Sequence, residues 1–76
     1  MRYGRRCIIQ FKTEEYLTEK LNWNKEYAKI VCDQIGIITD VDYFRYEIEL
    51  YKDRSVKVVA NEDSVFIPSG YIRNKE

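Results

Sequence analysis

The stretch from Gln34 to Pro68, QIGIITDVDYFRYEIELYKDRSVKVVANEDSVFIP, decides the fold and fills nearly half of the chain. Near its centre, apolar side chains occupy every second position and polar ones lie between them. The apolar positions are Phe44, Tyr46, Ile48 and Leu50. A period of two is typical of a strand with one buried face and one wet face. The pattern therefore predicts a long strand over residues 44–50 with these four side chains buried.

Polar turns divide the rest of this stretch into shorter strands. The expected strands are residues 36–41, 44–50, 56–60 and 65–67. A three-residue step from Ile38 to Val41 indicates a bend or bulge in the first of them. Asp42-Tyr43 is expected to connect it tightly to the long strand. Pro68 ends the last strand or lies on a sheet edge, because proline cannot donate to a strand ladder.

The N-terminal part of the chain is less regular. Residues 5–12 are a strand candidate, and residues 13–33 form an excursion with short helical pieces. Thr13 can cap a first piece, and Asn24 can cap a second over residues 25–31. The residues spaced to share one side of the second piece are Tyr27, Ile30 and Val31. Either piece could instead be an ordered loop, because isolated helices of this length are marginal.

Size and charge restrict the class of protein. The 76 residues make a single domain over 1–76, with 73–76 as a frayed tail. Thirteen Lys and Arg balance thirteen Asp and Glu, and this disfavours a protein that holds nucleic acid mainly through its phosphates. No run approaches the roughly 20 apolar residues of a membrane span, and no signal peptide is recognised. We therefore expect a cytoplasmic protein without a membrane partner.

Catalytic and metal-binding chemistry is hard to assemble from this sequence. It contains no histidine, so the usual proton shuttle near neutral pH is absent. Cys7 and Cys32 are expected to be reduced and partly buried, with a disulfide as the alternative, and two cysteines alone do not make an ordinary zinc site. The carboxylate pairs Asp40–Asp42 and Glu47–Glu49 could hold a cation, or form the solvated side of a strand. We expect no enzyme activity, no cofactor and no metal.

Binding to another macromolecule is the function that the side chains favour. Aromatic residues and arginine dominate interface energetics, and the sequence offers Trp23, Tyr43, Arg45 and Tyr51. A protein partner is therefore expected, and a homodimer is also possible. The alternative structural role for Trp23 and several tyrosines is to cap the open ends of the fold.

Nucleic acid is the alternative partner, because small barrels bind single strands by aromatic stacking beside a basic groove. The residues that could form such a surface are Tyr3, Tyr43, Phe44, Arg2, Arg5, Arg6 and Arg45. Zero net charge and the acids of the central strands oppose this reading. The arginines near the N-terminus could equally be a solvated end.

The order of these segments resembles a known architecture. The segments that carry the resemblance are GRRCII (4–9), QIGIITDV (34–41), YEIEL (46–50) and DSVFIP (63–68). Together they are similar to Src-homology-3-like small barrels, and more narrowly to the short barrels common among bacteriophage-encoded accessory proteins. The resemblance implies a mainly β, antiparallel barrel of about five strands. It also implies an accessory role in the host cytoplasm, in which the protein binds and modulates a host or phage protein.

One local similarity implies two more site residues. FIPSGYI (66–72) resembles the closing segment of peptide-binding Src-homology-3 domains, where a proline and a tyrosine line the groove. Carried over, Pro68 and Tyr71 would face a proline-rich peptide beside Trp23. The aromatic-acidic-aromatic run of those domains does not follow the first strand here, and Trp23 lies within the excursion.

Overall fold

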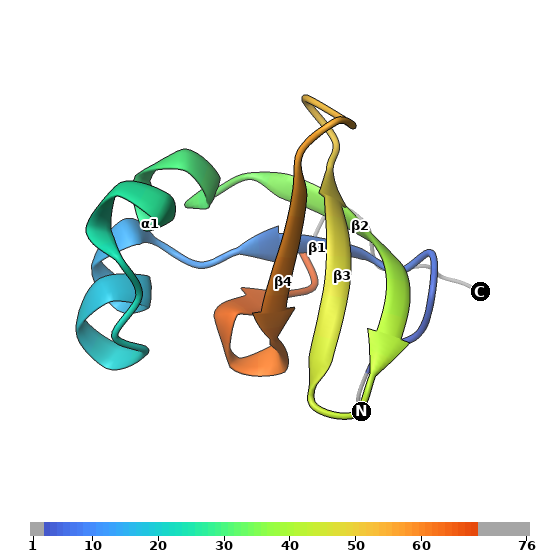
Figure 1. Cartoon of the computed structure of the whole chain (residues 1–76), viewed down its shortest axis with the longest axis horizontal. Helices are drawn as coiled ribbons and strands as arrows, with labels where there is room; N and C mark the ends of the chain where they lie inside the picture. Colours follow the sequence, from blue (N-terminus) through green and yellow to red (C-terminus); the bar gives the residue numbers. More distant parts are fainter. Residues whose placement is uncertain (1–2, 69–76) are drawn as a thin grey trace.

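Five antiparallel strands form one sheet in the computed structural model, which describes residues 3–68. The strands are β1 (Ile8–Phe11), β2 (Ile35–Asp42), β3 (Arg45–Leu50), β4 (Lys57–Asn61) and β5 (Val65–Phe66). They lie in the order β4-β3-β2-β1-β5 (Figure 1). The helical segments are the π-helix η1 (Tyr16–Lys20), the α-helix α1 (Lys25–Val31) and the 3-10 helix η2 (Glu62–Ser64). The prediction of a mainly β chain with short helical pieces between residues 13 and 33 is confirmed.

The sheet does not close into the predicted barrel. β4 and β5 form its two edges, and within residues 3–68 they do not pair with each other. β5 has only two residues, and both pair with β1 at Gln10 and Phe11. η2 carries the chain from one edge toward the other without adding a strand between them.

One face of the sheet supplies most of the core. The residues of the hydrophobic core are Ile9, Phe11, Leu17, Ala28, Val31, Ile38, Tyr46, Ile48, Leu50, Val58, Ala60 and Val65. The predicted alternation therefore holds for Tyr46, Ile48 and Leu50, which are buried. It is wrong for Phe44, whose side chain is 80% exposed.

The position of a turn explains the exposure of Phe44. Asp42 pairs with Arg45, so Tyr43 and Phe44 form the turn between β2 and β3. The predicted connection at Asp42-Tyr43 is thus one residue too early. Because β3 begins at Arg45, Phe44 lies outside the ladder that directs its neighbours toward the core.

A bulge and a glycine fit β2 against its neighbours. The register between β2 and β3 shifts between Ile38 and Asp40, which confirms the predicted bulge. A Cβ atom at Gly36 would lie 2.5 Å from Ile48 Cγ2 and 3.0 Å from the Glu49 carbonyl oxygen. Only glycine therefore allows this close approach of the two strands.

Two side-chain caps define the helical excursion, as the sequence predicts. Thr13 Oγ1 accepts a hydrogen bond from the Tyr16 N–H at 3.1 Å, and Asn24 Oδ1 accepts one from the Tyr27 N–H at 3.1 Å. The second cap begins α1 at Lys25, the predicted residue.

The three residues predicted to share one side of α1 differ in their burial. Ala28 and Val31, three residues apart, are buried, whereas Tyr27 and Ile30 are 40% and 59% exposed. The helix therefore turns Ala28 and Val31 to the core and leaves Tyr27 and Ile30 at the surface.

The first strand is shorter than predicted because a turn precedes it. Arg6 has a φ of 71°, and the Cys7 N–H donates to the Gly4 carbonyl at 3.2 Å. Residues 4–7 therefore form a turn, and β1 begins at Ile8.

Candidate binding surface

The predicted site residues on the β3 hairpins lie at opposite ends of the sheet. Tyr43 is 85% exposed in the β2–β3 turn, and Arg45 follows it at the start of β3. Tyr51 is 64% exposed just after the end of β3. A strand of this length separates its ends by about 20 Å, so Tyr43 and Tyr51 cannot contact the same small part of a partner.

The remaining predicted site residues lie elsewhere. Trp23 is partly buried and packs against the core, which agrees with a capping role. Pro68 is buried, and Tyr71 lies outside the described residues. Pro68 therefore does not present an exposed ring, and the groove that the resemblance implies at Pro68 and Tyr71 stays a prediction.

β4 presents an unpaired backbone edge. Among the described residues it pairs only with β3. The Leu50 N–H donates to the Val56 carbonyl at 3.2 Å. This bond fixes which residues of β4 direct their backbone N–H and C=O groups toward β3 and which direct them away from it. Val58 therefore directs its N–H and C=O toward β3, whereas Lys57 and Val59 direct theirs toward the open side.

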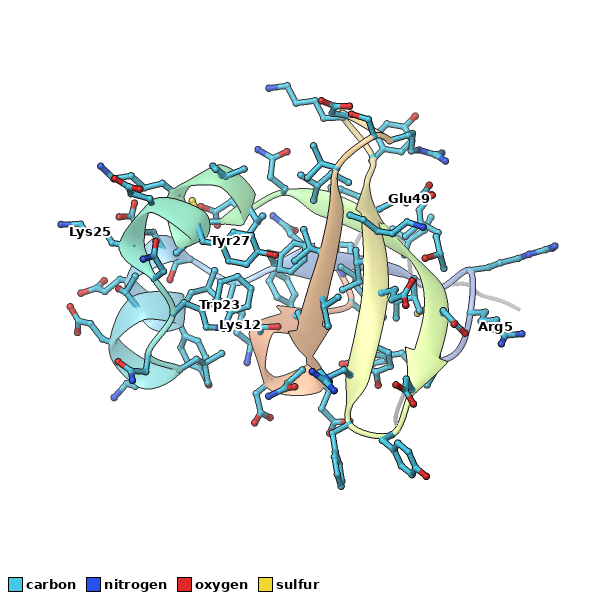
Figure 2. The ribbon with its side chains drawn as sticks, viewed as in Figure 1. Arg5, Lys12, Trp23, Lys25, Tyr27 and Glu49 are labelled. Carbon is cyan, nitrogen blue, oxygen red and sulfur yellow. The ribbon has the colours of Figure 1, made fainter. Side chains whose placement is uncertain are left out.

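Two stacked aromatic rings lie beside this edge. The ring centroids of Trp23 and Tyr27 are 5.3 Å apart with an interplanar angle of 27°, and Trp23 meets Phe11 edge-on at 6.2 Å. Figure 2 shows Trp23 and Tyr27 between the helical excursion and β4. A shallow groove of about 280 Å³ is lined by Trp23, Asn24, Tyr27, Val59, Ala60 and Asn61. Val59 is 50% exposed there, on the wet face of the sheet.

A second hollow lies at the end of β4. It has a volume of about 420 Å³ and is lined by Tyr43, Phe44, Asn61, Glu62 and Asp63. The centroids of the Tyr43 and Phe44 rings are 6.4 Å apart with an interplanar angle of 34°. Asn61 lines both this hollow and the groove beside Trp23, so the two are neighbours on one surface.

Two of the carboxylates considered as cation ligands lie next to arginine side chains. Arg5 Nη2 lies 3.0 Å from Asp40 Oδ1, and its hydrogen bond holds the pKa of the Asp40 carboxyl below its usual value. Arg54 Nη1 lies 3.6 Å from Glu49 Oε1. Within residues 3–68, no group of three or more His, Cys, Asp or Glu side chains is arranged to hold a metal ion.

The two cysteines are partly buried, as predicted, and no disulfide joins them. Burial and the neighbouring Asp33 and Glu14 carboxylates raise the pKa of the Cys32 thiol. A raised pKa lowers the thiolate fraction at neutral pH, which argues against Cys32 as a nucleophile.

Over the same described part of the chain, no helix has the length and apolar character needed to cross a membrane.

Sequence reasoning missed several residues of this surface. Val59 carried the clearest signal, since it is an apolar residue at an outward-facing strand position. Glu62 and Asp63 looked like ordinary turn residues, and only the tertiary fold brings them beside Tyr43.

Comparison with family models, curated proteins and solved structures finds no match.

Proposed function

We propose that the protein is a non-enzymatic binding module that receives an extended segment of a protein partner along the open edge of β4. The observation that carries the proposal is the unpaired backbone of Lys57 and Val59 beside the stacked Trp23 and Tyr27 rings. An added strand gains affinity from main-chain hydrogen bonds and specificity from alternate side chains.

The side chains along β4 indicate the composition of such a segment. On the wet face, an acidic residue suits the position opposite Lys57, and a β-branched residue suits the position opposite Val59. Each such cross-strand pair contributes about 0.2–1 kcal/mol. Trp23 and Tyr27 line the groove beside Val59, so apolar residues are favoured in the part of the segment that lies over it.

The broader assignment is also a proposal. Five antiparallel strands, a long excursion between the first two and a short last strand support kinship with the Src-homology-3-like small barrels. A phage-type accessory role in the host cytoplasm depends on that resemblance alone. The proposal omits catalysis. The Ser55 hydroxyl donates to Asp53 Oδ1 at 2.6 Å, but both residues lie in an exposed turn, and the lowered pKa of Asp53 makes its carboxylate a weak base.

Nucleic acid is the less favoured partner. Tyr43 and Phe44 lie beside the Glu62 and Asp63 carboxylates, which repel phosphate. Arg5, one of the basic residues considered for this role, already pairs with Asp40.

The test is selection of ten-residue linear peptides on the immobilised protein, followed by hydrogen exchange of the complex. The amides of Lys57 and Val59 should become protected, because they would donate to the added strand. Val59→Pro removes the outward N–H and should abolish binding, whereas Val59→Thr keeps the N–H and should bind as the wild type does. Folding of both variants is checked by their amide spectra.

Two results would overturn the proposal. One is protection confined to residues away from β4, and the other is equal binding by the proline and threonine variants. Protection of the same amides without peptide, rising with protein concentration, would show that a second copy occupies the edge instead.

A further inference from the structure

We infer that the hollow between the Tyr43–Phe44 turn and η2 binds an arginine side chain of a protein partner. This inference concerns a different surface from the β4 edge and does not depend on strand addition. It follows from the exposed rings, the charges around them and their contrast with the other exposed tyrosines.

Two other tyrosine rings in the chain already carry a cation. Lys12 Nζ lies 4.4 Å from the centroid of the Tyr16 ring, and Arg54 Cζ lies 5.7 Å from that of Tyr51. In residues 3–68, no Lys or Arg lies over the ring of Tyr43 or Phe44. Among the described residues, these two rings are also the most exposed large hydrophobic side chains, at 85% and 80%.

The charges around the hollow favour a cation. Glu62 and Asp63 line it, and Asp42 immediately precedes the aromatic turn. Arg45 is the one basic residue next to the turn, and it pairs in register with Asp42. Arg45 also pairs in register with Asn61, which lines the hollow, so this end of the sheet holds the carboxylates of Asp42, Glu62 and Asp63 and one guanidinium group, a net negative charge.

The shape of the hollow suits a planar cation. The rings of Tyr43 and Phe44 and the side chains of Glu62 and Asp63 line the same hollow. A guanidinium group can stack on a ring while its N–H groups donate to a carboxylate, whereas an ammonium group acts as a point charge. The combination therefore favours arginine over lysine.

The experiment is an NMR titration with N-acetylargininamide, using the neutral isostere N-acetylcitrullinamide as the matched probe. The arginine probe should shift the ring signals of Tyr43 and Phe44 and the amides of Glu62 and Asp63, and the citrulline probe should not. Glu62→Gln with Asp63→Asn should weaken binding by about fivefold or more, the size expected when exposed charge contacts are lost. Tyr43→Ala with Phe44→Ala should remove it, and Tyr51→Ala should leave it unchanged.

Equal shifts with both probes would overturn the inference, because no charge recognition would then be present. Unchanged affinity in the glutamine–asparagine variant would do the same, as would shifts centred on Tyr16 or Tyr51. Arginine binding at the hollow is tested separately from strand addition at β4. Strand addition is measured by the protection of the β4 amides and by the peptide binding of Val59→Pro.

Discussion

The two turns that flank β3 carry exposed aromatic rings but differ in how those rings are held. In the β3–β4 turn, Asp53 Oδ1 accepts hydrogen bonds from the Ser55 N–H at 3.1 Å and the Ser55 hydroxyl at 2.6 Å. The Val56 N–H donates to the Asp53 carbonyl at 3.0 Å, and Arg54 lies over the Tyr51 ring. This turn is held by its own hydrogen bonds, and one of its own cations lies over its ring.

The β2–β3 turn lacks such local support. Tyr43 has a φ of 46°, a region that disfavours bulky residues, although the turn contains neither glycine nor asparagine. Among the described residues, no side-chain hydrogen bond or ion pair holds Tyr43 or Phe44. Backbone strain that brings no local gain is typical of functional positions. The contrast supports the proposal that the β2–β3 turn contacts a partner.

The largest expected effect comes from removing the support that the two turns share. Ile48 is fully buried at the centre of β3 and pairs with Ile38 and Val58. Ile48→Ala should lower the free energy of unfolding by about 2–5 kcal/mol, because it leaves a cavity in the core beneath the strand that joins both turns. Urea denaturation measures the change. Val59→Ala, at a half-exposed position, should stay within about 0.5 kcal/mol of the wild type, and equal losses in both variants would contradict the core assignment.

Relieving the backbone strain in the β2–β3 turn should change the free energy of unfolding by a smaller amount and in the opposite direction. Tyr43→Gly should raise the free energy of unfolding by about 1 kcal/mol, because glycine adopts a positive φ without steric conflict. The same variant should bind N-acetylargininamide more weakly. Tyr51→Gly provides the contrast, since Tyr51 has no positive φ and should only lose stability. A less stable Tyr43→Gly protein would show that the turn is not strained.

Removing the cation that lies over the Tyr51 ring should have a smaller effect on stability. Arg54→Ala removes the cation over Tyr51 and a partly exposed ion pair with Glu49, so we expect a loss of about 0.5–1 kcal/mol. Thermal unfolding measures the loss, and the Tyr51 ring signals should move. Lys52→Ala removes a neighbouring charge that contacts no ring, so it should have no comparable effect. If Arg54→Ala and Lys52→Ala lose the same stability, the contact between Arg54 and the Tyr51 ring does not contribute to stability.

The smallest effect concerns the acid response of the β3–β4 turn. Hydrogen bonds from the Ser55 hydroxyl and backbone N–H hold the pKa of Asp53 below its usual value. A lowered pKa in the folded state gives stability that is present above the unfolded value of 3.8 and is lost as the pH falls through the folded value. Ser55→Ala should raise the pKa of Asp53 toward 3.8, as followed by carboxyl NMR. The pKa of Asp40 is lowered by Arg5 and should respond to Arg5→Ala instead.

Local signals in the sequence were sufficient for much of the fold. Asn24 marked the start of α1 because its side chain caps the helix directly, and the step from Ile38 to Val41 marked the bulge. The alternation from Tyr46 to Leu50 identified β3 because both neighbouring strands hold it in register. Each of these features depends on residues close together in the chain.

Features that depend on distant segments were not predictable in this way. Alternation does not show where a strand ends, so Phe44 was placed in the core although the pairing of Asp42 with Arg45 excludes it. Closure of the sheet depends on whether β4 meets β5, which no local pattern states. The hollow at Tyr43 likewise forms only when η2 folds back beside the β2–β3 turn.

The pairing of β1 with β5 has a consequence for biosynthesis. Gln10 lies opposite Phe66, so one side of the first strand stays unmatched until nearly the whole described chain has left the ribosome. Contacts between such remote positions form late and slow the folding reaction. We therefore expect nascent chains that stop before Val65 to remain accessible to chaperones and proteases, and synthesis of Val65 and Phe66 to be the step that closes this side of the sheet.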